Sequence, residues 1–400
     1  MYNKFFILKK KILIGYIYKL FFVPFTLHFP FLPSYCLSSL MACNQHKVWR
    51  RVAFLLSLLS ILQICARGDP QVPCYFILGD SLSDNGNNNG LSTKAKANFK
   101  PYGIDFPVGP TGRFSNGRTI VDVTAELLGF GEYIPPFTSA KGRDVLKGVN
   151  YASASAGILD ESGKQLGQAI PLGGQLKNYL KTFSQISKIL GGGTAAHKYL
   201  NKCMFTVGIG SNDFINNYFM PDVFRTSELY SLDRFVATLI DQYSQYLQTL
   251  YKCGARKVAL FGLGPIGCAP AELARYGATP GSICVDKIND AVVRFNKRLI
   301  SLVDDLNDNY KDAKFTYINI LEIGTGDATA AGFKVTNSGC CGGQKGCLPL
   351  ATPCKNRDEY TFWDEFHPTD AMNVIFANRA YKALTPTDAH PIDISTLACL

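Results

Sequence analysis

The sequence of 400 residues predicts an α/β protein in which helices cover both faces of one central parallel β-sheet. Short runs rich in β-branched and aromatic residues alternate along the chain with longer amphipathic segments. The short runs are apolar at consecutive positions, which is typical of strands buried on both faces of a parallel sheet. The expected strands are residues 74–78, 145–152, 203–209, 257–263 and 314–320.

Two of the connecting segments have a clear helical period. Apolar residues recur at steps of three and four over residues 232–250, and Gly254 then follows as a helix C-terminal cap would. The same period runs over residues 288–306. Right-handed crossovers place such helices against the sheet, so we interpret these apolar stripes as core packing. Residues 69–400 show no linker or internal repeat and are expected to form one domain.

The first 68 residues are expected to be targeting sequence. From Met41, a basic segment precedes an uncharged apolar run at 52–64, and small residues follow, which is the anatomy of a secretory signal peptide. We therefore expect a signal peptide at 41–68 and interpret residues 1–40 as an upstream extension. The alternative is an N-terminal anchor, because residues 20–40 lack Asp, Glu, Lys and Arg and are long enough to span a bilayer.

The charge distribution argues against a nucleic-acid partner. The formal net charge is +10, but nine of the 41 Lys and Arg residues lie in residues 1–68, which contain no acidic residue. Beyond residue 68, 32 basic residues face 31 acidic ones, so this part of the chain is close to neutral. Binding phosphates requires a clustered excess of cations on the folded surface. Residues 69–400 also contain no further apolar run of membrane-spanning length.

Ten of the 13 cysteines lie beyond residue 68. An even number on a secretory route favours disulfides, and several are expected to close the Gly-rich loop CCGGQKGC at 340–347. The alternative is a zinc site formed by Cys340, Cys341, Cys347 and Cys354. That site lacks the usual C-x-x-C spacing and has no nearby His, so disulfides are the prediction, with their connectivity left open.

Polar or Gly-rich segments follow four of the predicted strands. Ser81 follows the first strand, SASAG at 153–157 the second, Asn212 the third, and GLGPIG at 262–267 the fourth. Ligands of parallel sheets bind beyond the carboxyl ends of the strands, where these loops converge. We therefore expect all four segments to meet on one rim of the sheet.

Only one of the three histidines beyond residue 68 stands in a context that suggests catalysis. His197 follows GGGTAA in an expected loop and His390 lies in the polar tail, so both are expected to be solvated. His367 stands in FWDEFHPTD, three residues after Asp364. On a turn, this spacing lets the carboxylate bond Nδ1 and leaves Nε2 free to accept a hydroxyl proton. A serine hydroxyl needs such a base to become a nucleophile, and Ser81 is the candidate.

Seven dispersed motifs occur in order over about residues 73–384: FILGDSLSDNGNNN, GRFSNGRTIVD, GVNYASASAG, GIGSNDFINNY, GLGPIGC, CCGG and DEFHPT. In order and approximate spacing, they resemble the motifs of the plant GDSL esterase/lipase family of the SGNH hydrolases. The resemblance implies a flavodoxin-like three-layer α/β/α sandwich, the SGNH hydrolase fold. It also implies that Ser81 is the nucleophile, activated by His367, with Asp364 orienting the imidazole.

The same resemblance implies an oxyanion hole, in which donors already face the charge that develops on the substrate carbonyl oxygen. Its donors would be the backbone amide of Ser81, the side-chain amide of Asn212 and one backbone amide after the second strand. Many relatives have Gly-Gly there, whereas this chain has Ala154 and Ser155, with Gly157 farther on. Side chains at these positions disfavour a positive φ without removing an N–H. The donor among Ala154, Ser155 and Gly157 stays open.

Three other kinds of site fit the sequence less well. Residues 80–91 only vaguely resemble a calcium loop, because Leu91 stands where a closing Glu is needed, so no metal is expected. The acidic and Asn side chains of this loop are expected to bond its own backbone instead. GLGPIG matches a dinucleotide-binding pattern but follows the fourth strand and contains Pro265. The chain also lacks the G-x-S-x-G elbow of α/β-hydrolases.

The expected function is that of a secreted serine esterase or lipase that hydrolyses carboxylic esters through an acyl-enzyme. The alternatives are an acyltransferase that uses the same site and a non-catalytic sugar- or lipid-binding relative. This chemistry needs no cofactor, and the expected partner is a small-molecule or lipid ester. By resemblance, the location is extracellular, in the cell wall or apoplast.

Overall fold

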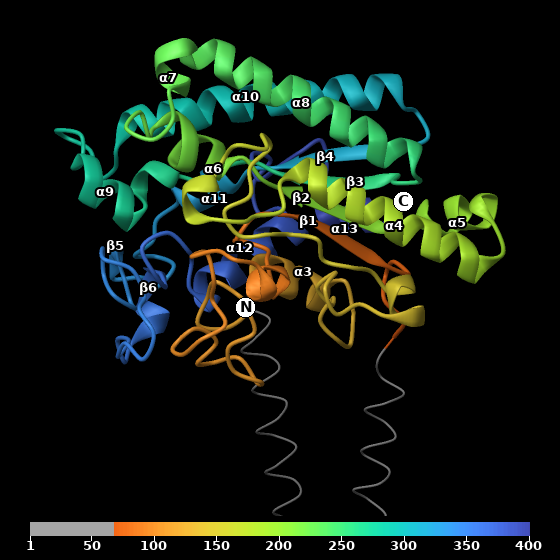
Figure 1. Cartoon of the computed structure of the whole chain (residues 1–400), viewed down its shortest axis with the longest axis horizontal. Coiled ribbons are helices and arrows are strands. Elements are labelled where there is room, and N and C mark those ends of the chain that lie inside the picture. Colours follow the sequence, from red (N-terminus) through yellow and green to blue (C-terminus); the bar gives the residue numbers. More distant parts are fainter. Residues whose placement is uncertain (1–67) are drawn as a thin grey trace, which may run out of the picture. The chain divides into compact units, whose positions relative to one another are not determined.

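The computed structural model describes residues 68–400, which form one compact unit built around a five-stranded sheet in the order β1-β2-β3-β4-β7 (Figure 1). β1 to β4 are parallel, and β7 pairs antiparallel with β4 at one edge. The strands are β1 (Tyr75–Gly79), β2 (Met204–Gly208), β3 (Lys257–Phe261), β4 (Lys314–Ile318) and β7 (Ala389–His390). The expectations for residues 1–40 and for nearly all of 41–68 lie outside the described residues.

Helices cover both faces of the sheet, as the alternation predicted (Figure 1). Phe76 and Leu78 of β1 face a core that also contains α4, α8 and α10, whereas Tyr75 and Ile77 face a core with α3, α12 and α13. This alternation is the period of two that an extended strand imposes. The helices are α3 (Ile120–Leu127), α4 (Leu172–Leu190), α8 (Leu232–Lys252), α10 (Asp286–Asn309), α12 (Asp370–Tyr381) and α13 (Ile394–Cys399).

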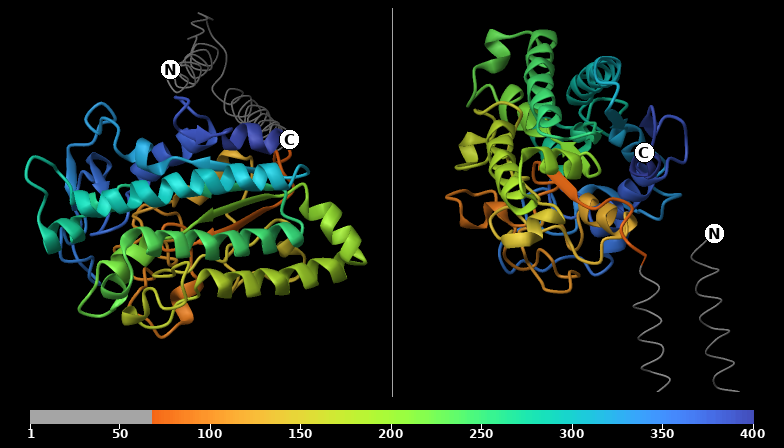
Figure 2. Two further views of the ribbon diagram at one scale, coloured as in Figure 1. Left: turned by 90° about the horizontal axis from the view of Figure 1, so that it is seen from above. Right: turned by 90° about the vertical axis from the view of Figure 1, so that its right-hand side faces the viewer.

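Local signals begin and end the long helices. The Ser231 hydroxyl accepts a hydrogen bond from the Arg234 amide and caps the start of α8, and Gly254, with φ +102°, follows its end. Figure 2 shows α8 and α10 as long, neighbouring helices in one layer. The periodicity predicted for 232–250 and 288–306 is therefore confirmed.

Shorter elements connect these layers and build the loops beyond the sheet. The α- and π-helical ones are α5 (Gly193–Leu200), α6 (Ser211–Asp213), the π-helix η4 (Phe214–Tyr218), α7 (Thr226–Leu229), α9 (Pro270–Tyr276) and α11 (Ile320–Gly324). The 3-10 helices are η1 (Asn87–Gly90), η2 (Gly142–Leu146), η3 (Lys164–Leu166), η5 (Ile266–Cys268) and η6 (Arg357–Glu359). A second sheet pairs β5 (Val335–Gly339) with β6 (Tyr360–Phe362).

The second predicted strand, 145–152, is only partly extended. Its first residues belong to η2, and Gly148, with φ +125°, then allows a close approach to β1, where a Cβ would lie 1.9 Å from the Tyr75 carbonyl oxygen. Beyond it, the Ile77 amide donates to the Val149 carbonyl, and the Tyr151 amide donates back to the Ile77 carbonyl. This segment therefore runs beside β1 as an irregular edge and forms an isolated bridge instead of a regular strand.

Two expectations for histidines were wrong in secondary structure. His197 lies in α5 and not in a loop, and its ring packs edge-on against Phe183. His390 belongs to β7, and its Nε2 lies 2.7 Å from an Asp304 oxygen. The added strand β7 is too short for its alternation to appear in the sequence, and it makes the edge of the sheet antiparallel.

Eight cysteines form four disulfides, which confirms the disulfide prediction. The pairs are Cys74–Cys203, Cys268–Cys284, Cys340–Cys354 and Cys341–Cys347, whereas Cys253 and Cys399 form no disulfide within residues 68–400. Two of the bonds close the Gly-rich loop, as expected. Since the cysteines of the alternative zinc site are paired, they have no thiolates to offer a metal.

Within residues 68–400, no helix combines the length and the apolar composition that a membrane span needs.

Candidate active site

Ser81 stands on a tight turn at the carboxyl end of β1. The Asp80 carbonyl accepts the amides of Ser83 and Asp84 at 3.1 and 2.9 Å, and the Asp80 carboxylate accepts the Leu82 amide at 3.0 Å. Just before the turn, Gly79 packs so closely on β2 that a Cβ would lie 2.8 Å from the Gly208 carbonyl oxygen. The backbone around Ser81 is therefore held on both sides.

Buried polar side chains fix the loop after Ser81. The Asp84 carboxylate accepts the Gly86 and Asn87 amides at 2.8 Å and the Ala154 amide at 2.9 Å. The Asn88 side chain donates to the Ala154 carbonyl at 3.0 Å. Asp84 thus bonds its own loop, as expected, while the asparagines also tie the loop to the segment after residue 150.

The turn that carries His367 arranges its hydrogen bonds around Asp364. One Asp364 oxygen accepts the backbone amides of Phe366 and His367 at 2.8 Å, and both oxygens lie 2.8 Å from His367 Nδ1. His367 Nε2 lies 2.7 Å from Ser81 Oγ. With its proton on Nδ1, the imidazole donates to the carboxylate and can accept the serine proton at Nε2.

Two aromatic residues that the sequence arguments missed complete the surroundings of this pair. The Tyr102 hydroxyl donates to Asp364 at 2.7 Å, and the Phe114 ring lies 4.7 Å from the imidazole, centroid to centroid. Phe114 stands in GRFSNG, a motif of the resemblance, whereas nothing in the local sequence distinguishes Tyr102 from a core aromatic residue.

Electrostatics favour an ionised carboxylate beside a basic imidazole. Burial alone would lower the pKa of His367, but the Asp364 carboxylate, aided by Glu365 and Asp80, raises it above its usual value. Burial opposes ionisation of Asp364, yet the imidazole and the Phe366 and Tyr102 donors hold its pKa below the usual value. For Asp80, burial dominates and raises the pKa to about 6.

Asn212 lies at the start of α6, just beyond β2, with its amide orientation held by hydrogen bonds. Its Nδ2 donates to the Ala156 carbonyl at 3.0 Å, and its Oδ1 accepts Asn216 Nδ2 at 2.6 Å. Asn216 is held in turn by Gln165 Nε2 at 2.7 Å. Nδ2 carries two hydrogens and uses one for the Ala156 carbonyl, so the second is left to point at a ligand.

Ala154, Ser155 and Gly157, the three candidates for the second backbone donor of the oxyanion hole, differ in their backbone contacts. The Ala154 amide is already bonded to the Asp84 carboxylate. Gly157 packs on Asp213 and Ser162, where a Cβ would lie 2.4 Å from the Ser162 Cβ. Ser155 lines the cavity with φ +61°, the left-handed conformation that side chains disfavour. Ala154 lines the cavity as well, so the strained residue is the cavity-lining one whose amide is not bonded to Asp84.

A cavity of about 1160 Å³ brings these groups together. Its walls contain members of all four segments predicted to meet on one rim: Ser81, Ser155, Asn212 and Pro265 with its neighbours. His367 and many apolar side chains, among them Leu82, Phe99, Ile215, Met220, Ile283 and Phe376, also line it. The arrangement can hold an apolar substrate against a serine, an imidazole and amide donors.

Comparison with known proteins agrees with this arrangement. The family model for GDSL-like lipases/acylhydrolases matches residues 75–380. A GDSL esterase/lipase of Arabidopsis thaliana is 52% identical over 343 residues, covering 84% of this chain and 95% of the relative. Two others from the same plant are each 53% identical over 343 residues, covering 84% of this chain and 94% of each relative. The chain belongs to the GDSL-like lipase/acylhydrolase family and is a carboxylic ester hydrolase.

Among solved structures, a family two carbohydrate esterase from Clostridium thermocellum aligns with 78% of this chain and 63% of its own. Its identity of 12% and TM-score of 0.32 are too low to support any conclusion about this protein.

Proposed function

We propose that this protein hydrolyses carboxylic esters through an acyl-enzyme, with Ser81 as nucleophile, His367 as general base and Asp364 as its orienting partner. The observation that carries the proposal is the continuous line from the Ser81 hydroxyl through His367 to Asp364, with contacts of 2.7 and 2.8 Å. A serine, an imidazole and a buried carboxylate in this order are what nucleophilic catalysis by a hydroxyl needs.

The reaction would proceed in two halves. Ser81 Oγ attacks the ester carbonyl carbon while His367 Nε2 takes its proton, and collapse of the tetrahedral intermediate breaks the bond to the alcohol, which receives that proton. Water then attacks the acyl-serine, with His367 again taking and returning the proton. Asp364 stabilises the imidazolium in both halves without itself being protonated.

The developing negative charge would be held by the backbone amides of Ser81 and Ser155 together with Asn212 Nδ2. We choose Ser155 because the Ala154 amide is bonded to Asp84 and Gly157 packs on Asp213. A strained left-handed residue at this place suggests that its amide direction matters for function. Donors fixed before the reaction avoid the cost of reorganising water.

Hydrolysis of short-chain nitrophenyl esters tests the proposal. Ser81→Ala and His367→Ala should each abolish turnover with the thermal midpoint preserved. His197→Gln, in a helix that carries none of the groups invoked above, should leave turnover unchanged and serves as the control. A folded wild type without turnover would instead favour the non-catalytic binding protein, and turnover that survives Ser81→Ala would overturn the assigned nucleophile.

Acyl transfer is the second candidate, because a cavity of about 1160 Å³ has room for an acceptor alcohol beside the acyl group. An alcohol in place of water would attack the same acyl-serine. Product analysis with glycerol or a sugar added to the reaction separates the two outcomes. Transfer product exceeding free acid at millimolar acceptor would assign the enzyme as an acyltransferase.

We also propose that the enzyme is secreted, with residues 41–68 as a cleaved signal peptide. The four disulfides of the folded part support an oxidising compartment. N-terminal sequencing of the protein from culture medium should begin near Asp69. A mature chain that retains Cys43 would contradict the proposal.

A further inference from the structure

The wall of the cavity contains a buried carboxyl group that the proposed mechanism does not use. Glu272, in the first turn of α9, is 2% exposed and lines the same cavity as Ser81. Its carboxyl forms no hydrogen bond or ion pair with any residue of 68–400, and Oε2 is fully buried without a partner. Burial raises the pKa of Glu272 to about 7, against the opposing effect of Arg275 and Lys287.

An unpaired carboxyl at such a place is costly, because burial removes its hydrogen bonds to water and no protein group replaces them. The buried carboxylate of Asp213 avoids that cost. Asp213 accepts the Ile158 and Leu159 amides and the Ser162 hydroxyl at 2.7–3.0 Å. Glu272 therefore differs from the structural carboxylates of the same molecule, as a group kept for a ligand would.

Glu272 is linked to the reacting groups through Glu365, a residue of the turn that carries His367. Glu365 lies between Asp364 and Phe366, lines the same cavity, and also has a buried Oε2 without a partner among the described residues. Its backbone carbonyl accepts the amide of Ala271, the neighbour of Glu272, at 3.0 Å. α9 is thus bonded directly to the turn that carries His367.

The chemistry of the ligand follows from the surrounding charges. Arg275 lines the same cavity, and Arg275 and Lys287 both favour the charged form of Glu272, so positive charge already lies near this carboxyl without a cationic ligand. Apolar neighbours of the cavity such as Ile266 and Ile283 favour an uncharged ligand. A hydroxyl group suits the site in either protonation state, because it donates to a carboxylate and accepts from a carboxylic acid.

We propose that Glu272 binds a hydroxyl group of the substrate, so that the enzyme prefers esters that carry a free hydroxyl besides the ester itself. This inference rests on the proposed ester hydrolysis at Ser81. The hydroxyl belongs either to the acyl chain or to the alcohol, since both parts of an ester would extend from Ser81 into the one cavity.

The experiment compares three octanoate-type esters of matched length. One is unsubstituted propyl octanoate, one carries a hydroxyl on the acyl chain, and one is the glycerol monoester, which carries hydroxyls on the alcohol. kcat/KM is measured for the wild type, Glu272→Gln, Glu272→Leu and the exposed control Glu322→Leu. We expect the wild type to prefer one hydroxylated ester about tenfold or more, a preference that Glu272→Leu removes and Glu322→Leu keeps.

The hydroxylated ester that the wild type prefers shows whether Glu272 binds a hydroxyl of the acyl chain or one of the alcohol. Glu272→Gln keeps the shape and part of the hydrogen bonding, so it should retain an intermediate preference. The thermal midpoint of Glu272→Leu should be unchanged or higher, because an unpaired buried carboxyl is removed, whereas a structural carboxyl would lower it on removal.

If the ratios of kcat/KM among the three esters are the same in Glu272→Leu as in the wild type, this inference is overturned. Catalysis by Ser81 would be unaffected by that result. Turnover that persists in Ser81→Ala would overturn the proposed mechanism instead, so the two failures are distinguishable.

Discussion

The two sides of the candidate site are held in place by different means. The side that carries Ser81 extends from the central sheet, and hydrogen bonds from Asp84 and Asn88 fix its loop. The side that carries Asp364 and His367 follows the small sheet of β5 and β6, next to two disulfides. Its backbone is bonded to them, since the Cys341 amide donates to the Trp363 carbonyl at 2.7 Å.

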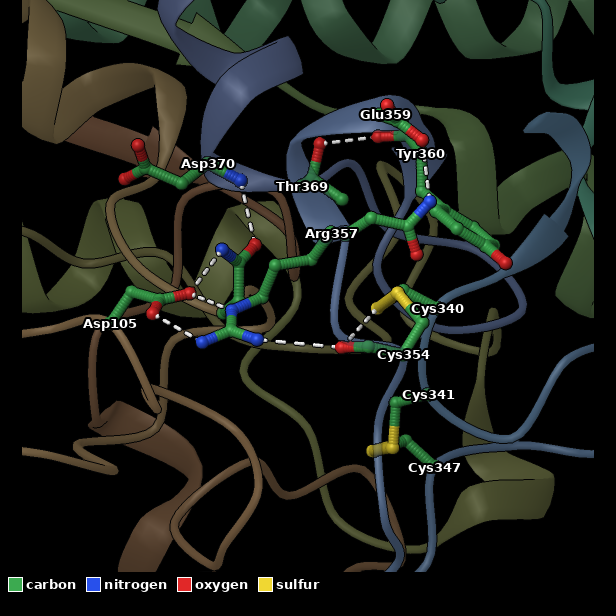
Figure 3. The surroundings of a disulfide bond; sticks show 12 residues. Asp105, Cys340, Cys341, Cys347, Cys354, Arg357, Glu359, Tyr360, Thr369 and Asp370 are labelled. Atoms are coloured by element: carbon green, nitrogen blue, oxygen red, sulfur yellow. Dashed lines mark hydrogen bonds and ion pairs between the residues drawn. A yellow bond between two sulfur atoms is a disulfide. The ribbon is translucent and has the colours of Figure 1, made fainter. Parts of the chain in front are cut away.

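The histidine side also has a hydrophobic cluster of its own, formed by Tyr102, Phe114, Trp363 and the paired cysteines. An ion pair joins this region to the loop of Tyr102. Figure 3 shows Arg357, near the Cys340–Cys354 disulfide, reaching Asp105 with contacts of 2.5 and 2.9 Å. The base is therefore held by cross-links and packing, and the nucleophile by the sheet and its polar loop.

We expect this difference to separate activity from stability. Damage to the serine side should disturb the central sheet, and hence folding as a whole. Damage to the histidine side should displace His367 while the main core stays intact. The following variants sharpen or break this comparison.

Asp364→Asn should have the largest effect, a loss of about 10⁴ in kcat, because the amide no longer favours the tautomer with a free Nε2. The turn should persist, since the remaining carbonyl oxygen still accepts the Phe366 and His367 amides. The measurement is kcat with a nitrophenyl ester, together with a thermal melt. A loss below tenfold would show that Asp364 does not orient the base.

Asn212→Ala should lower kcat about 10² to 10³-fold with little change in KM, because one oxyanion donor is removed.

Asn216→Leu should produce a smaller loss of kcat, since Asn216 only holds the Asn212 amide in place. Asn307→Leu is the matched control, because Asn307 bonds the backbone of Phe315 far from the cavity residues. It should lower the thermal midpoint and leave kcat unchanged; a loss of stability alone in Asn216→Leu would make that residue merely structural.

Removal of two disulfides by Cys→Ser pairs tests the comparison directly. Cys341–Cys347 closes a loop of sequence separation 6, whereas Cys74–Cys203 joins the start of β1 to β2 over 129 residues. In the chain-entropy model, their loss costs about 2 and about 5 kcal/mol of stability, respectively. The Cys341/Cys347 variant should nevertheless lose more kcat, about tenfold, because Cys347 lines the cavity and the Cys341 amide bonds Trp363, the neighbour of Asp364.

Chemical denaturation gives the stability of both disulfide variants, and kcat is measured well below their unfolding temperatures. The comparison fails when the Cys74/Cys203 variant, still folded, loses more kcat than the other.

The smallest effect expected is a shift of the acid limb of kcat/KM. His367 must be neutral to accept the serine proton, and its pKa is raised by Asp364, so activity should fall as the pH drops through a value above 6.5. Tyr102→Phe removes a donor that shares the charge of Asp364, which should move this limb to still higher pH. A limb below 6.5 in the wild type would contradict the electrostatics described here.

Local patterns in the sequence carried much of the fold and part of the candidate site. The alternation of apolar strands and periodic helices predicted the layers, because those periods follow from the geometry of a single segment. The contact of Asp364 with His367 was predictable for the same reason, since it spans three residues. The second strand was misjudged because its apolar composition does not show the turn at Gly148 or the 3-10 start.

By itself, the sequence determined four parallel strands of the sheet and the long helices at 232–250 and 288–306, where Ser81 and His367 lie relative to the predicted elements, and which cysteines surround the Gly-rich loop. Only the tertiary structure decided that Tyr102 meets Asp364 and that Asn216 holds Asn212. It also decided that, of the two cavity-lining residues Ala154 and Ser155, it is Ala154 whose amide is bonded to Asp84. Nor does the sequence near Glu272 show that its carboxyl has no partner among residues 68–400. Such contacts join residues that the chain order does not bring together, and the packing of loops decides them.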